Sequence, residues 1–313
     1  MRLAIVAGLT SKGPARVSFS AMRLGRAICV SLDEGVCRVV ADALTSAGLT
    51  VEHTTSIPAD VTGAVAVIVD RATRLAAPTV LRGLSVPVVV VGDDLDDDGL
   101  ITLMLEGPVS HLVRDPGDPQ LQITSEKLAT GDMFGLEKYV SPGVTVGERL
   151  INTDSDKRHA IDEVCAWAEA VGARRPIVAR ISSGVDELVM NALRESDGDL
   201  RRRARGAVLR WAKDDGTIAI SVGDRFGTLR QHDVLDHVRR ARTEKGRPQS
   251  PAESQGAGLG LYLVLANVAS LIVNVTPGEQ TEVVCLFDLA APSKRGAIGS
   301  GVRSLHVFQM VGT

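Results

Sequence analysis

The chain has 313 residues, of which 44% are hydrophobic and 23% are charged, and this composition excludes general disorder and a fibrous repeat. Its formal net charge of −3, from 35 basic and 38 acidic residues, argues against a nucleic-acid coat or a polybasic membrane binder. The length favours two domains, because a typical domain has about 150 residues.

The cysteines and the apolar stretches indicate the compartment. Four cysteines are spaced unlike metal ligands, which suits small core residues in a reducing environment: Cys29, Cys37, Cys165 and Cys285. The longest apolar stretch, 259–275, contains Asn267 and Ser270 and changes its period, which predicts a helix followed by a strand instead of a membrane span. The opening apolar run is too short for an export signal. We therefore expect a cytoplasmic protein that binds neither membranes nor nucleic acids.

Residues 1–25 are predicted to form an extension in front of the first domain. Gly, Ser and Pro interrupt residues 8–20, and the tripeptide at Met22 repeats the opening Met-Arg-Leu just before the first regular strand. We therefore interpret the preceding residues as loosely held and leave the true start residue open.

Residues 26–116 alternate between short apolar runs and segments with apolar residues at helical spacing. Such alternation is typical of an α/β domain, in which helices cover both faces of a parallel, flavodoxin-like sheet. Gly48 stands where a left-handed residue would end the first helix. The expected strands are 27–31, 51–56, 64–69, 87–91 and 111–113, and the expected helices are 36–47, 72–81 and 99–105.

The periodicity fades between residues 117 and 152, where Pro and Gly recur, and this stretch is predicted to be a linker. Residues 153–313 form the second domain, in which two helical patterns precede several strands. Asp215-Gly216 joins two of these strands and is a strong hairpin signal. Helices followed by antiparallel strands predict an α+β domain. The expected helices are 157–171 and 177–195, and the expected strands are 208–212, 217–222, 271–275 and 281–288.

Three segments of the second domain carry groups suited to binding a nucleotide. Glu187 and Asn191 lie four residues apart on one expected helix, so that a carboxylate and an amide project from the same face toward a metal-bound polyphosphate. Asp224 ends a buried strand, where a single acceptor can bind the amino group of a ligand. The run Gly256-Ala-Gly-Leu-Gly-Leu261 opens a helix, and backbone N–H groups at the positive end of a helix suit a phosphate.

Two other kinds of glycine loop do not fit this run. A Rossmann fingerprint requires GxGxxG directly after a strand, whereas the spacing here is GxGxG after a polar stretch, 247–255. A Walker loop requires GxxxxGK[ST], but the candidate at Gly8 to Gly13 is followed by Pro14. Each nucleotide-binding signal taken alone also fits a solvated helix face, a turn or a tight loop, and it is their order along the chain that favours a ligand site.

Together these segments resemble the GHKL, or Bergerat-fold, ATP-binding domain that histidine kinases, gyrase, Hsp90 and anti-sigma-factor serine kinases share. Glu187–Asn191 resembles the N-box, Asp224–Gly227 the first glycine box, the run 256–261 the second, and Gly278 to Thr281 the final Gly-x-x-Thr. The resemblance covers residues 156–288 and implies a two-layer sandwich.

The resemblance also implies a role for each residue. Asn191 would coordinate Mg²⁺, and Glu187 would polarise the attacking water or hydroxyl. Asp224 would accept a hydrogen bond from the adenine amino group of ATP, with Thr281 beside it and Gly227 in the adjoining loop. The phosphates would lie beneath a lid, 231–255, against three glycines: Gly256, Gly258 and Gly260.

The chain departs from the family pattern in the first glycine box. The usual motif is Asp-x-Gly-x-Gly, but Phe226 and Thr228 occupy the glycine positions, and only Gly227 remains, one position out of step. His159 is followed by Ala160 instead of an acidic residue, and there is no room for a long helical hairpin before the N-box. The pattern therefore resembles the anti-sigma-factor serine kinases more than the histidine kinases.

The first domain has a weaker resemblance, to response-regulator receivers. Asp70 ends the third strand, where the phospho-acceptor would be, and Asp33-Glu34 resembles the acidic pair that holds Mg²⁺. Gly92 and Arg114 replace the hydroxyl residue and the lysine that phosphoryl transfer needs there. We therefore expect a pseudo-receiver that serves for interaction or dimerisation.

The sequence thus predicts a signalling protein that binds Mg·ATP and a protein partner, with a homodimer as a further option. Two functions stay open. One is transfer of phosphate to Ser or Thr of a partner, with Glu187 as the base. The other is a non-catalytic module in which ATP orders the lid and creates a partner surface. A histidine-kinase core that acts on another protein is a third interpretation.

Overall fold

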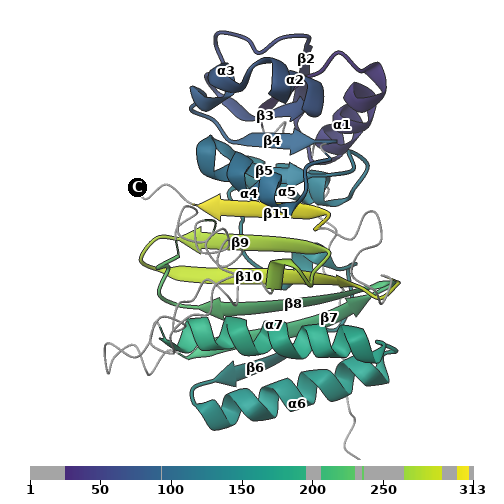
Figure 1. Ribbon diagram of the computed structural model, residues 1–313, viewed down its shortest axis with the longest axis vertical. Coiled ribbons are helices and arrows are strands. Elements are labelled where there is room, and N and C mark those ends of the chain that lie inside the picture. The colour runs from purple at the N-terminus through teal and green to yellow at the C-terminus, as the bar shows by residue number, and fades with distance from the viewer. Residues whose placement is uncertain are drawn as a thin grey trace, which may run out of the picture.

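A computed structural model describes residues 25–92, 94–194, 206–229, 235, 264–290 and 302–309. The extension expected at 1–25 lies outside these ranges except for Gly25, and so do the glycine run 256–261 and most of the lid expected at 231–255. Within the described ranges the protein has a mixed α/β fold (Figure 1).

The first half of the chain forms a parallel sheet in the order β2-β1-β3-β4-β5. This is the strand order of flavodoxin-like sheets, so the parallel sheet expected for 26–116 is confirmed. Helices α1 and α5 pack together on one face, and α3 and α4 cover the other, with α2 beside α3. The strands are β1 (Arg26–Val30), β2 (Thr50–Thr54), β3 (Ala64–Asp70), β4 (Val88–Val91) and β5 (Val109–Val113), and the helices are α1 (Glu34–Ser46), α2 (Arg71–Ala76), α3 (Pro78–Arg82), α4 (Asp97–Glu106) and α5 (Gln120–Thr130).

The local sequence explains these elements. β4 consists of four valines that are all buried, as in an interior strand covered on both faces. Asp33 caps α1, because its side chain accepts hydrogen bonds from the N–H groups of Gly35 and Val36. Gly48 follows the end of α1 with a φ of +81°, a conformation that glycine adopts without strain.

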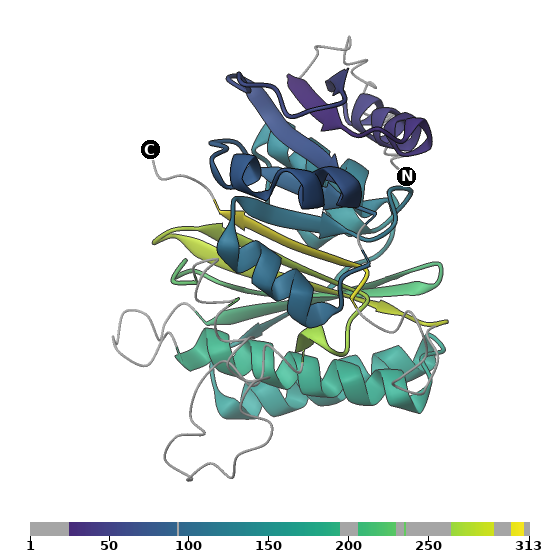
Figure 2. The same ribbon diagram turned by 45° about the horizontal axis from the view of Figure 1, so that its top comes forward.

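The second half forms an antiparallel sheet in the order β9-β10-β8-β7-β6. Helices α6 and α7 cover the face that also carries α4 (Figure 2), and α5 and the short helix η1 pack against the other face. The stretch 117–152, which was expected to be a linker, contains α5, η1 and β6. The elements are η1 (Leu136–Tyr139), β6 (Gly147–Ile151), α6 (Asp154–Ala170), α7 (Arg175–Arg194), β7 (Ala207–Asp214), β8 (Thr217–Asp224), β9 (Ser270–Thr276) and β10 (Gln280–Asp288).

The strand β11 (Ser304–Gln309) joins both halves into one sheet, which has eleven strands within the described residues (Figure 1). It pairs antiparallel with β5 and parallel with β9. Two domains with sheets of their own were expected, and the structure differs, because β5 and β9 would each present an edge of unpaired backbone groups that β11 covers. One apolar core beneath α4 and α7 continues across this seam.

Buried histidines line the seam between β5 and β11. His111 and His306 are register partners, their ring centroids lie 5.5 Å apart, and both are buried. Nδ1 of His306 lies 3.1 Å from the hydroxyl of Thr124 on α5. Burial lowers the pKa of both imidazoles, that of His306 to about 3, and the charge of Lys127 adds to this effect.

We expect acid to weaken the seam. The pKa of His111 and His306 in the folded protein lies below the value of 6.5 expected in the unfolded chain. The unfolded state therefore binds more protons below pH 6.5, and the free energy of unfolding falls as the pH decreases from there. The slope is up to about 1.4 kcal/mol per pH unit for each imidazole.

Urea unfolding of two variants at several pH values measures this contribution. His306→Gln should reduce the fall of the unfolding free energy between pH 6.5 and about pH 5. His159→Gln, on the exposed side of α6, should leave the fall unchanged. An equal slope in both variants would contradict the role of the buried imidazole.

Candidate functional site

Asp224 and Thr281 face each other at one end of the second sheet, because they are register partners on β8 and β10. Side chains alternate between the two faces along a strand. Asp224 therefore shares the face of Ile220 and Val222, which belong to the core beneath α7, and Thr281 shares the face of Val283 in the same core. The carboxylate and the hydroxyl thus lie on the α7 face of the sheet.

Helix α7 runs beside these strands toward the same end. Just before its first residue, Arg174 donates a hydrogen bond of 3.2 Å to the backbone oxygen of Leu289, immediately after β10 ends. Further along, Gly184 passes over Phe287 so closely that a Cβ would lie 3.7 Å from the ring. The last turns of α7 are therefore directed toward the end of the sheet that holds the pair of Asp224 and Thr281 (Figure 1).

Three buried polar atoms on α7, on β10 and after β8 have no hydrogen-bond partner among the described residues. They are Oδ1 of Asn191, Oγ1 of Thr281 and Oγ1 of Thr228. Glu187 is half-buried, one turn before Asn191 and on the same helix face. A buried polar group without a partner costs about 1–3 kcal/mol, so these atoms have hydrogen-bonding capacity that the described residues do not satisfy.

The first glycine box and the final glycine turn touch each other at Gly227. Its backbone oxygen accepts a hydrogen bond of 3.0 Å from the N–H of Gly278, and its φ is +59°. A Cβ at this position would clash with the backbone oxygen of Thr276. Phe226, which stands where the family has glycine, is buried, and its N–H donates to Oδ1 of Asp224 at 2.8 Å. These contacts fix the loop that follows Asp224.

Gly227→Ala should therefore destabilise the protein. The added methyl group would clash with the oxygen of Thr276, and alanine is strained in the left-handed backbone conformation of residue 227. Together these effects should lower the free energy of unfolding by at least about 2 kcal/mol. Gly216→Ala, in the hairpin at the other end of β8, is the matched control, because nothing lies within 4 Å of its Cβ position. Urea unfolding measures both, and equal losses would contradict the close packing at Gly227.

The remaining parts of the expected site lie outside the described residues, namely Gly256, Gly258 and Gly260. Within the described part of the chain, no three or more Asp, Glu, His or Cys residues form a group that could hold a metal ion. A magnesium ion at Asn191 would therefore take its other ligands from phosphate oxygens and water, as this ion usually does.

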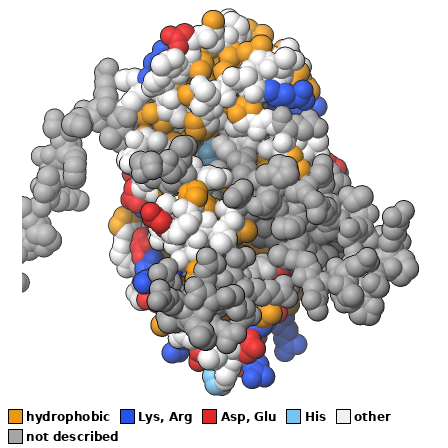
Figure 3. Space-filling model, turned by 90° about the vertical axis from the view of Figure 1, so that its left-hand side faces the viewer, with side chains coloured by type: hydrophobic (Ala, Val, Ile, Leu, Met, Phe, Trp, Pro, Cys, Tyr) orange, Lys and Arg blue, Asp and Glu red, His pale blue; other side chains and the backbone are white. Residues whose placement is uncertain are grey.

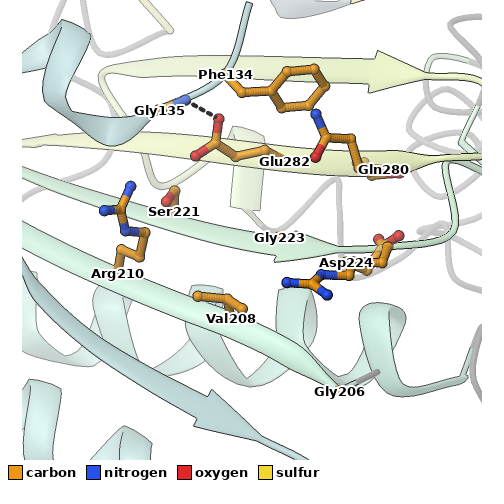
Figure 4. Close-up of a pocket in the computed structure, with 12 residues that line it drawn as sticks. Phe134, Gly135, Gly206, Val208, Arg210, Ser221, Gly223, Asp224, Gln280 and Glu282 are labelled. Atoms are coloured by element: carbon orange, nitrogen blue, oxygen red, sulfur yellow. Dashed lines mark hydrogen bonds between the residues drawn. The ribbon is translucent and has the colours of Figure 1, made fainter. Parts of the chain in front are cut away.

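A cavity of about 310 Å³ lies on the opposite face of the same strands (Figure 4). Its charged side chains are already paired with neighbours. Arg210 forms two hydrogen bonds with the carboxylate of Glu137, at 2.6 and 3.1 Å. Glu282 accepts hydrogen bonds from the N–H of Gly135 at 3.0 Å and from the amide of Asn274 at 3.1 Å. Asp224 and Thr281 of the expected nucleotide site also line this cavity, whereas Asn191 does not.

A buried lysine completes the polar network behind this cavity. Nζ of Lys127 donates hydrogen bonds of 2.7 Å to the hydroxyl of Tyr139 and to Oδ1 of Asn274, and it lies 3.7 Å from the ring centroid of Phe308. Burial lowers the pKa of Lys127 to about 7, against the opposing effect of Glu282. The sequence patterns do not indicate this network. The signal they offer is a polar residue inside each of two apolar strands, namely Asn274 in β9 and Glu282 in β10.

The receiver-like residues of the first half have structural partners. Asp70 caps α2, accepting hydrogen bonds from the N–H of Thr73 at 2.7 Å and from the hydroxyl of Ser31. Burial raises the pKa of Asp70, but these hydrogen bonds outweigh burial and hold the pKa below its usual value. Arg114 donates through Nε to the oxygen of Val302 at 2.6 Å, which ties the end of β5 to the segment that enters β11.

The described surface is mixed in character. Acidic and basic side chains are interspersed on the face seen in Figure 3, and apolar side chains are frequent toward its upper part. Leu32 and Leu75 are 75% and 58% exposed, and single exposed apolar residues of this kind are ordinary. Every helix of the described ranges is too short or too polar to traverse a bilayer.

Comparisons with known proteins give a partial likeness to solved structures. No family model matches this chain, and no curated protein matches it. Among solved structures, a chain in the crystal structure of the SiaB-SiaC complex from Pseudomonas aeruginosa is similar, with 14% sequence identity and a TM-score of 0.34. The match covers 46% of the present chain and 89% of that chain. It concerns about half of this chain and assigns no roles to its residues.

Proposed function

We propose that the second half of the chain binds Mg·ATP and that the protein is a cytoplasmic signalling protein of the GHKL type with a protein partner. The observation that carries the proposal is that two buried atoms, Oδ1 of Asn191 and Oγ1 of Thr281, have no hydrogen-bond partner among the described residues, and that Thr281 faces Asp224 at the end of the sheet. A nucleotide bound there would supply the missing hydrogen bonds. Four motifs in family order support the same site.

The residue types present fit this nucleotide. An amide oxygen is a suitable ligand for Mg²⁺, so Asn191 would hold the ion, and bound magnesium would neutralise charge on the phosphates. The carboxylate of Asp224 is an acceptor for the adenine amino group, and the hydrogen bond from the N–H of Phe226 orients it. The phosphates would lie against Gly256, Gly258 and Gly260.

Two substitutions test the site. Asn191→Ala removes the metal ligand, and Asp224→Asn replaces the charged acceptor by an amide. Each should weaken the binding of a fluorescent ATP analogue about tenfold to a hundredfold, because a hydrogen bond to a charged group contributes about 1.5–3 kcal/mol. Asp215→Asn, in the exposed hairpin at the other end of β8, should bind like the parent protein. Equal affinities in all three variants would contradict the site.

Glu187 distinguishes the two functions that the resemblance leaves open. If Glu187 is the base for a Ser or Thr hydroxyl of the partner, Glu187→Gln should lower the transfer of label from γ-labelled ATP at least about a hundredfold. Nucleotide affinity should change less than about threefold, because only the reacting hydroxyl loses an interaction. Asp186→Asn is the control, since this neighbouring carboxylate pairs with Lys157 at 2.8 Å outside the site.

The chemistry of the label identifies the acceptor. Label on Ser or Thr survives acid, whereas label on His or Asp does not. The parent protein could instead bind nucleotide and transfer no label to proteins that co-purify with it. That result would support the non-catalytic module, in which ATP orders a partner surface.

A further inference from the structure

A thiol, an imidazole and a backbone carbonyl converge at the carboxyl ends of β1 and β2, in the half of the sheet that does not hold the proposed nucleotide site. Sγ of Cys37, near the start of α1, lies 2.8 Å from Nε2 of His53 on β2. The same Nε2 lies 3.0 Å from the backbone oxygen of Ser31, to which the thiol of Cys37 also donates at 3.8 Å. The cysteines were expected to be core residues, and the pairing of β1 with β2 brings this one to a histidine.

The position of the Ser31 carbonyl indicates that Nε2 of His53 carries a proton. Two lone pairs 3.0 Å apart would repel each other, so Nε2 carries a hydrogen directed at the oxygen of Ser31 and at Sγ of Cys37. This N–H lies within hydrogen-bond distance of the sulfur and can donate to it when negative charge develops there during a reaction. The ring of His53 is exposed, so its other nitrogen can take up the thiol proton through water.

A second thiol lies next to Cys37. Cys29 on β1 is the register partner of His53, is 2% exposed, and belongs to the apolar cluster against which Cys37 packs. Burial raises the pKa of Cys29 to about 12, and the neighbouring Cys37 thiol and the Asp70 carboxylate add to this effect. Half-buried Cys37 is thus the accessible member of the pair, and Cys29 remains a neutral thiol beside it.

We propose that Cys37 is a redox-active thiol that hydroperoxides oxidise, with His53 as its activating group and Cys29 as the thiol that closes a disulfide with it. In the first step the thiolate of Cys37 attacks one peroxide oxygen, so that an S–O bond forms and the O–O bond breaks. The leaving alkoxide or hydroxide takes a proton from the imidazolium of His53. The peroxide gains two electrons, and the sulfur becomes a sulfenic acid.

The second step consumes the sulfenic acid. The sulfur of Cys29 attacks the sulfur of Cys37, an S–S bond forms, and the hydroxyl group leaves with the proton of Cys29 as water. The product ties the start of α1 to β1. The reaction needs no group from the proposed nucleotide site. A failure of either proposal therefore leaves the other unaffected.

Intact-mass spectrometry of the full chain tests the proposal. Hydrogen peroxide should remove about 2 Da, and dithiothreitol should restore the original mass. Cys37→Ser and Cys29→Ser should each abolish this loss, whereas the double variant Cys165→Ser/Cys285→Ser should retain it. Cys29→Ser should instead accumulate a sulfenic acid on Cys37 that dimedone traps and peptide mapping locates.

His53→Gln separates activation of the thiol from its mere exposure. At neutral pH this variant should react with peroxide at least about tenfold more slowly than the parent protein, with circular dichroism unchanged. At alkaline pH the two rates should converge, because the thiol then ionises without the imidazole. Three results would overturn the proposal: no loss of mass in the parent, a loss that persists in Cys37→Ser, or equal rates of parent and His53→Gln at neutral pH.

Discussion

The backbone hydrogen bonds around β11 hold the two halves of the protein together. The N–H of Arg114 donates to the oxygen of Arg303 at 2.9 Å, and the N–H of Arg303 donates to the oxygen of Ala269 at 2.6 Å. The chain therefore bridges β5 and β9 even before β11 begins. Because the sheet and the core beneath α4 and α7 are continuous there, the halves form one unit, and the hinge that a flexible linker would give is not expected.

Local patterns predict most elements of the fold, because their causes are local. The four valines of β4 and the Asp-Gly hairpin between β7 and β8 are examples. The seam could not be predicted in this way. Residues 304–309 are a short run of mixed polar and apolar residues, and nothing in that run indicates that β5 and β9 are its partners. The pairing of His111 with His306 follows from the pairing of β11 with β5, so the sequence patterns could not predict it either.

The same distinction holds for the candidate sites. Glu187 and Asn191 share a helix face because four residues make about one turn, and this geometry is readable from the sequence. The contact of Gly227 with Gly278 depends on the packing of two loops, which residue spacing alone does not bring together. The pair of Cys37 and His53 likewise exists only because α1 returns over β1 and β2. Interactions within one helix were predictable from spacing, whereas contacts between elements were predictable only where the family resemblance placed two motifs side by side, as for Thr281 beside Asp224.

The central claim is that segments far apart in the sequence close around one nucleotide on the α7 face of the sheet. Hydrogen–deuterium exchange with and without Mg·ATP tests it directly. Added nucleotide should slow exchange in peptides that contain residues 187–191, 224–228 and 278–281, and leave the peptide around Phe134 and Gly135, across the sheet, unchanged. Protection only around Phe134 and Gly135, or no protection at saturating nucleotide, would contradict the account.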